Sequence, residues 1–164
     1  MKKTFYIFII ILTSLTSFAQ DEIYDISFHY SHSLRIPNHY VDVEITRRGD
    51  ELQLHVATKA LSGSKEWSRE NIDTAFVITK EQFASLTTAV RKISCINIAK
   101  EIGTFSTGED GNTCEIKFGS FQNSMTYKIW TPDYETTERG LTDFYNCCLL
   151  IAKTARLKST ILFN

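Results

Sequence analysis

Proline and glycine are scarce in this chain of 164 residues, which contains 2 prolines and 7 glycines. That scarcity excludes collagen-like chains and Pro/Gly-rich disordered chains. The aromatic content of 12% is too high for a solvated, disordered polypeptide. Internal repeats of about 20 to 50 residues and low-complexity segments are missing as well. The sequence therefore predicts an ordinary globular domain without an internal linker.

Long runs of basic residues are also missing, since Arg47-Arg48 and Arg91-Lys92 are isolated pairs. A protein that binds nucleic acid needs a positive footprint that replaces the counterions of the phosphates. A polybasic segment that would hold the chain on an anionic membrane is likewise missing. The sequence thus argues against nucleic acid as a partner.

The longest apolar run is short and lies at residues 5–12, directly after Lys2 and Lys3. Small residues follow at Ser17 and Ala19, the spacing that signal peptidases cleave. A membrane-spanning helix needs about 20 apolar residues, so this run is too short for one. The pattern is typical of a secretory signal peptide.

We therefore expect residues 1–19 to be a secretory signal peptide and residues 20–164 to form a single exported α+β domain. Loss of the two lysines leaves 16 Lys and Arg against 19 Asp and Glu, a net charge of −3. The expected location is the periplasm or the extracellular space, with no stable membrane anchor after cleavage.

Four cysteines follow the predicted leader, at Cys95, Cys114, Cys147 and Cys148. Export makes disulfides possible, and adjacent residues on one helix point about 100° apart, so Cys147 and Cys148 are not expected to pair. The hypothesis is one disulfide from Cys95 to Cys148 or Cys147, which would stabilise the fold by roughly 4 kcal/mol. The alternative is four buried free thiols, because cysteine is also a good small hydrophobe.

Alternation of apolar and polar residues predicts strands in the first half of the chain. One strand is expected at 26–30, followed by a bend near Pro37. The segments 41–46 and 52–56 flank a short turn and predict a hairpin. The β-branched residues at 74–78 predict a further short strand.

Helical spacing begins at Lys80, where Thr79 and Gln82 have the spacing of a capping box. Apolar residues at every third or fourth position extend this helix to about Ile93. A polar loop containing three glycines is then expected at 101–113.

The second half predicts another hairpin, at 114–118 and 125–130, which ends at Pro132. Thr136 or Thr137 is the expected N-cap of a final, well-buried helix that runs to about Leu157. Because hairpins produce antiparallel pairing, the predicted fold class is α+β, with a five- or six-stranded antiparallel sheet and two helices packed on one face.

Signatures of catalytic and metal sites are incomplete. The sequence contains no HExxH motif and no paired CxxC motif, and His29 and His32 would point to opposite faces of a strand. The stretch 103–108 lacks the spacing of a nucleophile elbow, and 109–112 lacks the ligand pattern of a calcium loop. Accordingly, no catalytic residue, no metal ligand and no cofactor is predicted.

Aromatic residues flanked by charges at loop positions are typical of protein-binding hot spots. Two segments of the chain show this pattern around a tryptophan, and a third, acidic segment lies between them. The predicted protein-binding residues are Trp67, Arg69, Glu70, Glu109, Asp110, Trp130, Asp133, Tyr134 and Glu135.

These observations favour a small exported binding module, of the inhibitor or immunity type, that acts in the bacterial envelope. Its expected partner is another protein, such as a basic toxin or lytic enzyme, which an acidic inhibitor would meet with a raised association rate. One alternative is a binder of a small apolar ligand between the sheet and the helices. Another is a hydrolase with an unfamiliar site that uses the loop at 101–113 and one histidine.

Overall fold

The computed structural model describes residues 22–33, 39–60, 71–104, 111–158 and 162–163. The predicted signal peptide, the predicted bend near Pro37 and most of the polar loop expected at 62–71 lie outside these residues. No helix within them is long and apolar enough to cross a membrane.

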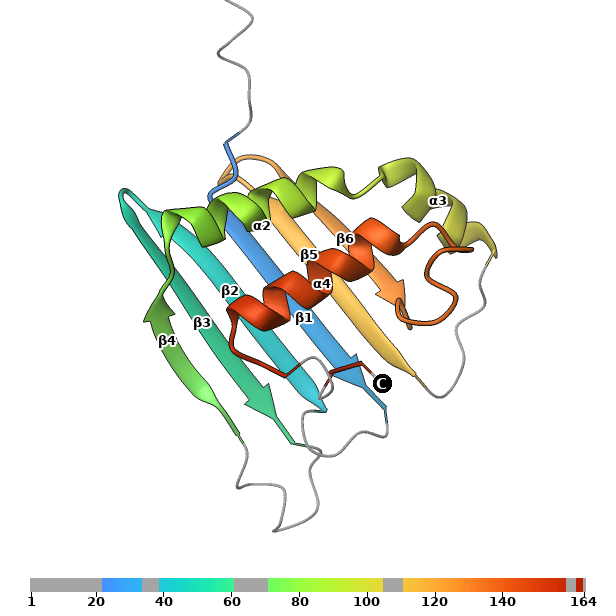
Figure 1. Ribbon diagram of the computed structural model, residues 1–164, viewed down its shortest axis with the longest axis horizontal. Coiled ribbons are helices and arrows are strands. Elements are labelled where there is room, and N and C mark those ends of the chain that lie inside the picture. The colour runs from blue at the N-terminus through green and yellow to red at the C-terminus, as the bar shows by residue number, and fades with distance from the viewer. Residues whose placement is uncertain (1–21, 34–38, 61–70, 105–110, 159–161, 164) are drawn as a thin grey trace, which may run out of the picture.

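The described chain forms one six-stranded antiparallel sheet in the order β4-β3-β2-β1-β5-β6. Figure 1 shows α2 and α4 side by side on one face of this sheet, with α3 beyond them next to β6. The predicted α+β class is therefore confirmed. The elements are β1 (Asp25–His32), β2 (Tyr40–Arg48), β3 (Glu51–Lys59), β4 (Asp73–Val77), α2 (Lys80–Lys92), α3 (Cys95–Thr104), β5 (Asn112–Gly119), β6 (Ser124–Trp130) and α4 (Thr142–Thr154).

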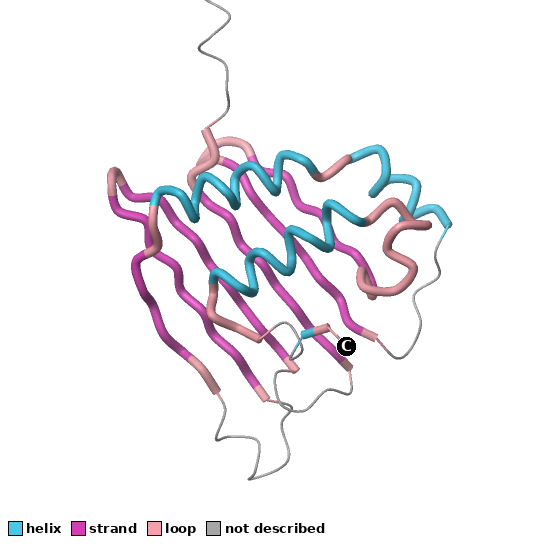
Figure 2. Tube along the Cα trace, in the orientation of Figure 1, coloured by secondary structure: helices cyan, strands magenta, loops and turns pink. Residues whose placement is uncertain are grey.

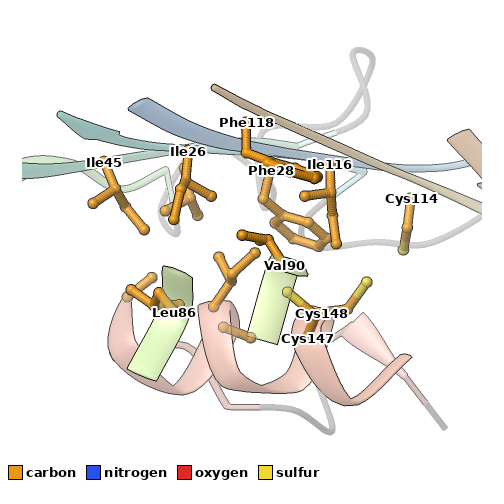
Figure 3. Close-up of a cluster of buried hydrophobic side chains, with 14 of the residues drawn as sticks. Ile26, Phe28, Ile45, Leu86, Val90, Cys114, Ile116, Phe118, Cys147 and Cys148 are labelled. Carbon is orange, nitrogen blue, oxygen red and sulfur yellow. The ribbon is translucent and has the colours of Figure 1, made fainter. Parts of the chain in front are cut away.

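The sheet buries one face because its strands alternate apolar and polar side chains with period two. On the central strand β1, Phe28 is 1% exposed and is paired with Val43 of β2 and Ile116 of β5. Figure 2 shows the strands running beneath the two helices, and Figure 3 shows the apolar side chains meeting between the two layers. The hydrophobic core therefore lies between the covered face of the sheet and α2 and α4.

Helix α2 begins where the sequence predicts it. The backbone amide of Gln82 donates to Thr79 Oγ1 at 3.2 Å, and the backbone amide of Thr79 donates to the side-chain oxygen Oε1 of Gln82 at 2.8 Å. Both bonds of a capping box are present, so two amides that the helix leaves unpaired have partners.

Two features of the predicted helices are wrong. First, residues 101–104 were expected to begin a loop, but they belong to α3. The sequence signal for this helix is Ser94, whose hydroxyl accepts a hydrogen bond from the Asn97 backbone amide at 3.3 Å. Second, α4 starts at Thr142 instead of following Thr136 or Thr137. Gly140 has a φ of 69°, a left-handed conformation that separates the preceding turn from the helix.

Tyr30 ties the C-terminal segment to the centre of the sheet, since its buried hydroxyl donates to the Leu162 carbonyl at 2.8 Å. A Tyr30→Phe substitution should lower the free energy of unfolding by about 1–2 kcal/mol, because the carbonyl loses a buried donor. Chemical denaturation measures this change. Tyr24 provides the control, since its hydroxyl donates to Glu22 Oε2 at 2.9 Å on the exposed surface, and Tyr24→Phe should change stability by no more than about 0.5 kcal/mol. Equal midpoints for the two variants would contradict the structural role of the bond.

Candidate functional site

The loop that connects β6 to α4 carries four of the predicted binding residues, and we name residues 130–139 the clamped loop. It begins at Trp130, the last residue of β6, whose side chain points away from the covered face because Tyr127 and Ile129 point towards it. The loop lies at one end of the sheet, beside the start of α4 (Figure 1).

The side chain of Arg139 holds this loop together through hydrogen bonds to its backbone. Its Nη1 donates to the Thr131 carbonyl at 2.6 Å and to the Tyr134 carbonyl at 2.8 Å, while its Nη2 donates to the Trp130 carbonyl at 2.9 Å. A guanidinium presents several donors in a fixed planar fork, so one side chain can hold three carbonyls at once. The backbone on both sides of Pro132 is thereby fixed relative to Arg139.

Strand β5 anchors the other side of the clamped loop. The Thr131 amide donates to the Asn112 carbonyl at 2.6 Å, and Asn112 Nδ2 donates to Asp133 Oδ1 at 3.0 Å. A Cβ on Gly111 would lie 2.5 Å from Thr131 Oγ1 and 2.9 Å from the Trp130 ring. Only glycine permits this close approach between the two segments.

The backbone of the clamped loop holds two strained residues. Thr131 has a φ of 43° and Glu135 has a φ of 46°, a region that non-glycine residues rarely adopt. Such residues cost of order 1–3 kcal/mol each and persist where the surrounding contacts impose them. Here those contacts are the bonds of Arg139 and Asn112. Strain of this kind is concentrated at functional sites, which makes the loop a candidate site.

The surface of the clamped loop is acidic and carries one prominent aromatic side chain. Tyr134 is 52% exposed, and Asp133, Glu135 and Glu138 lie around it in the sequence. The Tyr134 hydroxyl donates to the Glu135 carboxylate, and this bond together with the negative charge raises the pKa of Tyr134. The phenol presents both a ring and a hydroxyl.

The structure thus brings Trp130, Asp133, Tyr134 and Glu135 together in one ordered loop. Sequence reasoning missed Arg139 and Asn112, the residues that hold them. A cue for Arg139 is its place directly before Gly140, where a loop must close before a helix begins. The remaining predicted residues, which lie outside the described part of the chain, are Trp67, Arg69, Glu70, Glu109 and Asp110.

The structure contains no bond between Cys95 and Cys148 or Cys147, and all four cysteines are free thiols, so the predicted disulfide stays a prediction. Cys95 is exposed at the start of α3, whereas Cys147 and Cys148 are fully buried in α4. The alternative of four buried thiols fails only at Cys95. Burial raises the pKa of both α4 thiols, so neither is a reactive nucleophile in the folded protein.

The opposite ends of the strands form a second exposed surface, beside the start of β1 and the β5–β6 turn. Phe121 is fully exposed there, and a groove of about 380 Å³ runs between α2 and the β2–β3 turn. Four of the charged residues that line it pair within the chain, Arg47 with Glu22 and Lys80 with Asp50. With Arg91 the groove carries three basic and two acidic residues, whereas the clamped loop carries one basic and three acidic residues.

Two histidines on the uncovered face of the sheet, His29 and His55, each lie within hydrogen-bond distance of an aspartate. His29 Nδ1 lies 2.6 Å from Asp42 Oδ1, and His55 Nε2 lies 2.8 Å from Asp73 Oδ1. Among the described residues, no group of three or more His, Cys, Asp or Glu side chains is arranged to hold a metal ion. These pairs orient the imidazoles but include no nucleophile.

The hydrolase alternative required a polar loop at 101–113. Residues 101–104 instead belong to α3, and residues 105–110 lie outside the described part of the chain.

Comparison with known proteins gives no relative from which a role could be transferred. No protein-family model matches the chain, and no curated protein is significantly similar to it.

Proposed function

We propose that this protein is an exported binding module of the inhibitor or immunity type, which presents the clamped loop to a basic protein partner such as a toxin or a lytic enzyme. The observation that carries the proposal is the Arg139 clamp beneath an exposed tyrosine. The leader pattern of the sequence supports export, and the net charge of −3 supports a basic partner.

Rigidity of the loop supports protein binding on energetic grounds. Ordering a flexible side chain or loop upon association costs free energy, and a preorganised loop avoids much of that cost. Arg139 and Asn112 already hold the backbone around Tyr134. Tyrosine is among the side chains that contribute most to interfaces, because it combines a large apolar surface with a hydroxyl.

The charges of the loop support a basic partner in particular. Asp133, Glu135 and Glu138 outnumber Arg139 in the clamped loop, and the Arg139 guanidinium is engaged with backbone carbonyls. Complementary charge raises association rates and penalises wrong partners more than it raises affinity. A basic envelope enzyme fits this surface.

Binding should depend on Tyr134. The protein and its Tyr134→Ala variant are immobilised and exposed to native envelope extract, with quantitative mass spectrometry of the bound proteins. We expect one basic protein at stoichiometric level, with roughly tenfold or greater loss of affinity in Tyr134→Ala, since interface tyrosines act as anchors. Tyr24→Ala, at the opposite end of the strands, is the matched control and should bind normally.

Inhibition is then measured with the purified partner, which should lose its activity at a one-to-one ratio. A Glu135→Gln, Glu138→Gln double variant should associate more slowly and with a weaker dependence on salt concentration. Retention of the partner by Tyr134→Ala would contradict the proposed surface. A bound partner that stays fully active would contradict the inhibitor role.

A further inference from the structure

Three of the four cysteines lie in one region of the core, where α4 crosses β5. Figure 3 shows Cys114 pointing from the sheet towards α4, with Cys147 and Cys148 on the facing helix. All three side chains are 0% exposed. The exposed Cys95 is not part of this cluster.

Within the cluster, Cys114 and Cys148 are distinguished by direction: the side chain of Cys114 points from the sheet towards that of Cys148 on the helix (Figure 3). The Cys114 thiol donates to Asn112 Oδ1 at 3.8 Å, and its closeness to Cys148 contributes to the raised pKa of the Cys148 thiol. The neighbouring Cys147 lies next to Cys148 on the same helix, where its direction differs by about 100°. The thiols of Cys114 and Cys148 thus face each other across the two layers, with Cys147 beside them.

We propose that Cys114 and Cys148 are a disulfide-forming pair, which joins β5 to α4 when the protein folds in an oxidising environment. The oxidant is a disulfide of the glutathione or thiol–disulfide oxidoreductase class. The Cys114 and Cys148 thiols each lose one proton and one electron as their S–S bond forms. The oxidant accepts both electrons and both protons, its own S–S bond breaks, and it leaves as two thiols.

Burial determines when this oxidation takes place. Exchange requires a thiolate that an external disulfide can reach, and both sulfurs are enclosed in the folded core. The bond therefore forms during folding, before α4 closes over the sheet. Once formed, it is protected from reductants by the same burial.

The link would also strengthen the frame of the clamped loop. Cys114 lies two residues after Asn112, which holds Asp133, and Cys148 lies on the helix that directly follows the loop. A bond between them ties together the two elements that flank the loop.

Peptide mapping of refolded protein tests the pairing. The full chain without its leader is reduced, denatured and refolded with glutathione and glutathione disulfide, and free thiols are then alkylated under denaturing conditions. Trypsin places Cys95, Cys114 and the Cys147-Cys148 pair on three separate peptides, because lysines or arginines lie between them. We expect the second and third peptides to be linked, with Cys95 alkylated.

Two variants identify the partner of Cys114. Cys147→Ala should keep the link, and Cys148→Ala should lose it and leave all three remaining cysteines alkylated. Reduction in the unfolded state, followed by refolding in reductant, should lower the melting temperature of wild-type protein and of Cys147→Ala by roughly 10 °C, while that of Cys148→Ala should not respond. Four alkylated cysteines in refolded wild-type protein, or a link to Cys95 or Cys147, would overturn the proposal. The map needs no variant and no binding partner, so its outcome is independent of the proposed function.

Discussion

Replacing Arg139 with methionine should lower the free energy of unfolding by about 2–3 kcal/mol, because three backbone carbonyls lose charged donors. Arg139→Lys should be nearly as damaging, since a single ammonium cannot reproduce the planar fork of the guanidinium. Denaturant unfolding measures the stability, and hydrogen exchange of the amides at 131–140 measures the order of the loop. Exchange there should accelerate by roughly tenfold or more.

The control for this prediction is Arg48→Met, at an exposed position on β2. It should change stability by no more than about 0.5 kcal/mol, as is usual for surface substitutions. If Arg139→Met and Arg48→Met behave alike, the three hydrogen bonds do not hold the loop. If Arg139→Lys matches the wild type, a charge alone is sufficient and the fork geometry is irrelevant.

Truncation of Phe28 should have the largest effect on stability. This side chain lies at the centre of the sheet, 1% exposed, between Val43 and Ile116. Phe28→Ala removes the ring and leaves a cavity beneath the helices, which should cost about 3–5 kcal/mol. Denaturant unfolding should show a lower midpoint with little change in the slope.

Phe121 gives a matched comparison because it is the same residue type in full contact with solvent. Phe121→Ala should leave the free energy of unfolding within about 0.5 kcal/mol of the wild type. A small loss for Phe28→Ala would mean that the core can collapse around the missing ring, which is contrary to the packing in Figure 3.

The sheet could be predicted from the sequence because its information is local. Alternation in each hairpin fixes which side chains face the core, and the Thr79–Gln82 spacing fixes the start of α2. The start of α4 could not be predicted in the same way. Thr136 is a good N-cap by residue type, yet its hydroxyl donates backwards to the Pro132 carbonyl at 2.9 Å and serves a turn instead.

The candidate site could be predicted in part. Asp133, Tyr134 and Glu135 could be predicted as binding residues, because charged residues surround an aromatic residue in the sequence. The Arg139 clamp could not be predicted, because it depends on how the chain turns back between β6 and α4. The grouping of Cys114, Cys147 and Cys148 could not be predicted for a similar reason. Which thiols lie near one another is decided by the position of α4 over β5, which no local pattern contains.

The order of the strands has a consequence for how the molecule is assembled. The first strand, β1, is central and is completed by β5, which follows it some eighty residues later in the chain. Pairing across such separations slows folding, because loop-closure entropy is lost before the contacts form. The meander from β1 to β4 can form early, but one edge of β1 then stays open to other chains. A chain that lacks β5 and β6 should consequently aggregate. A chain that stays unfolded until its last third has been synthesised can instead close the sheet in one step.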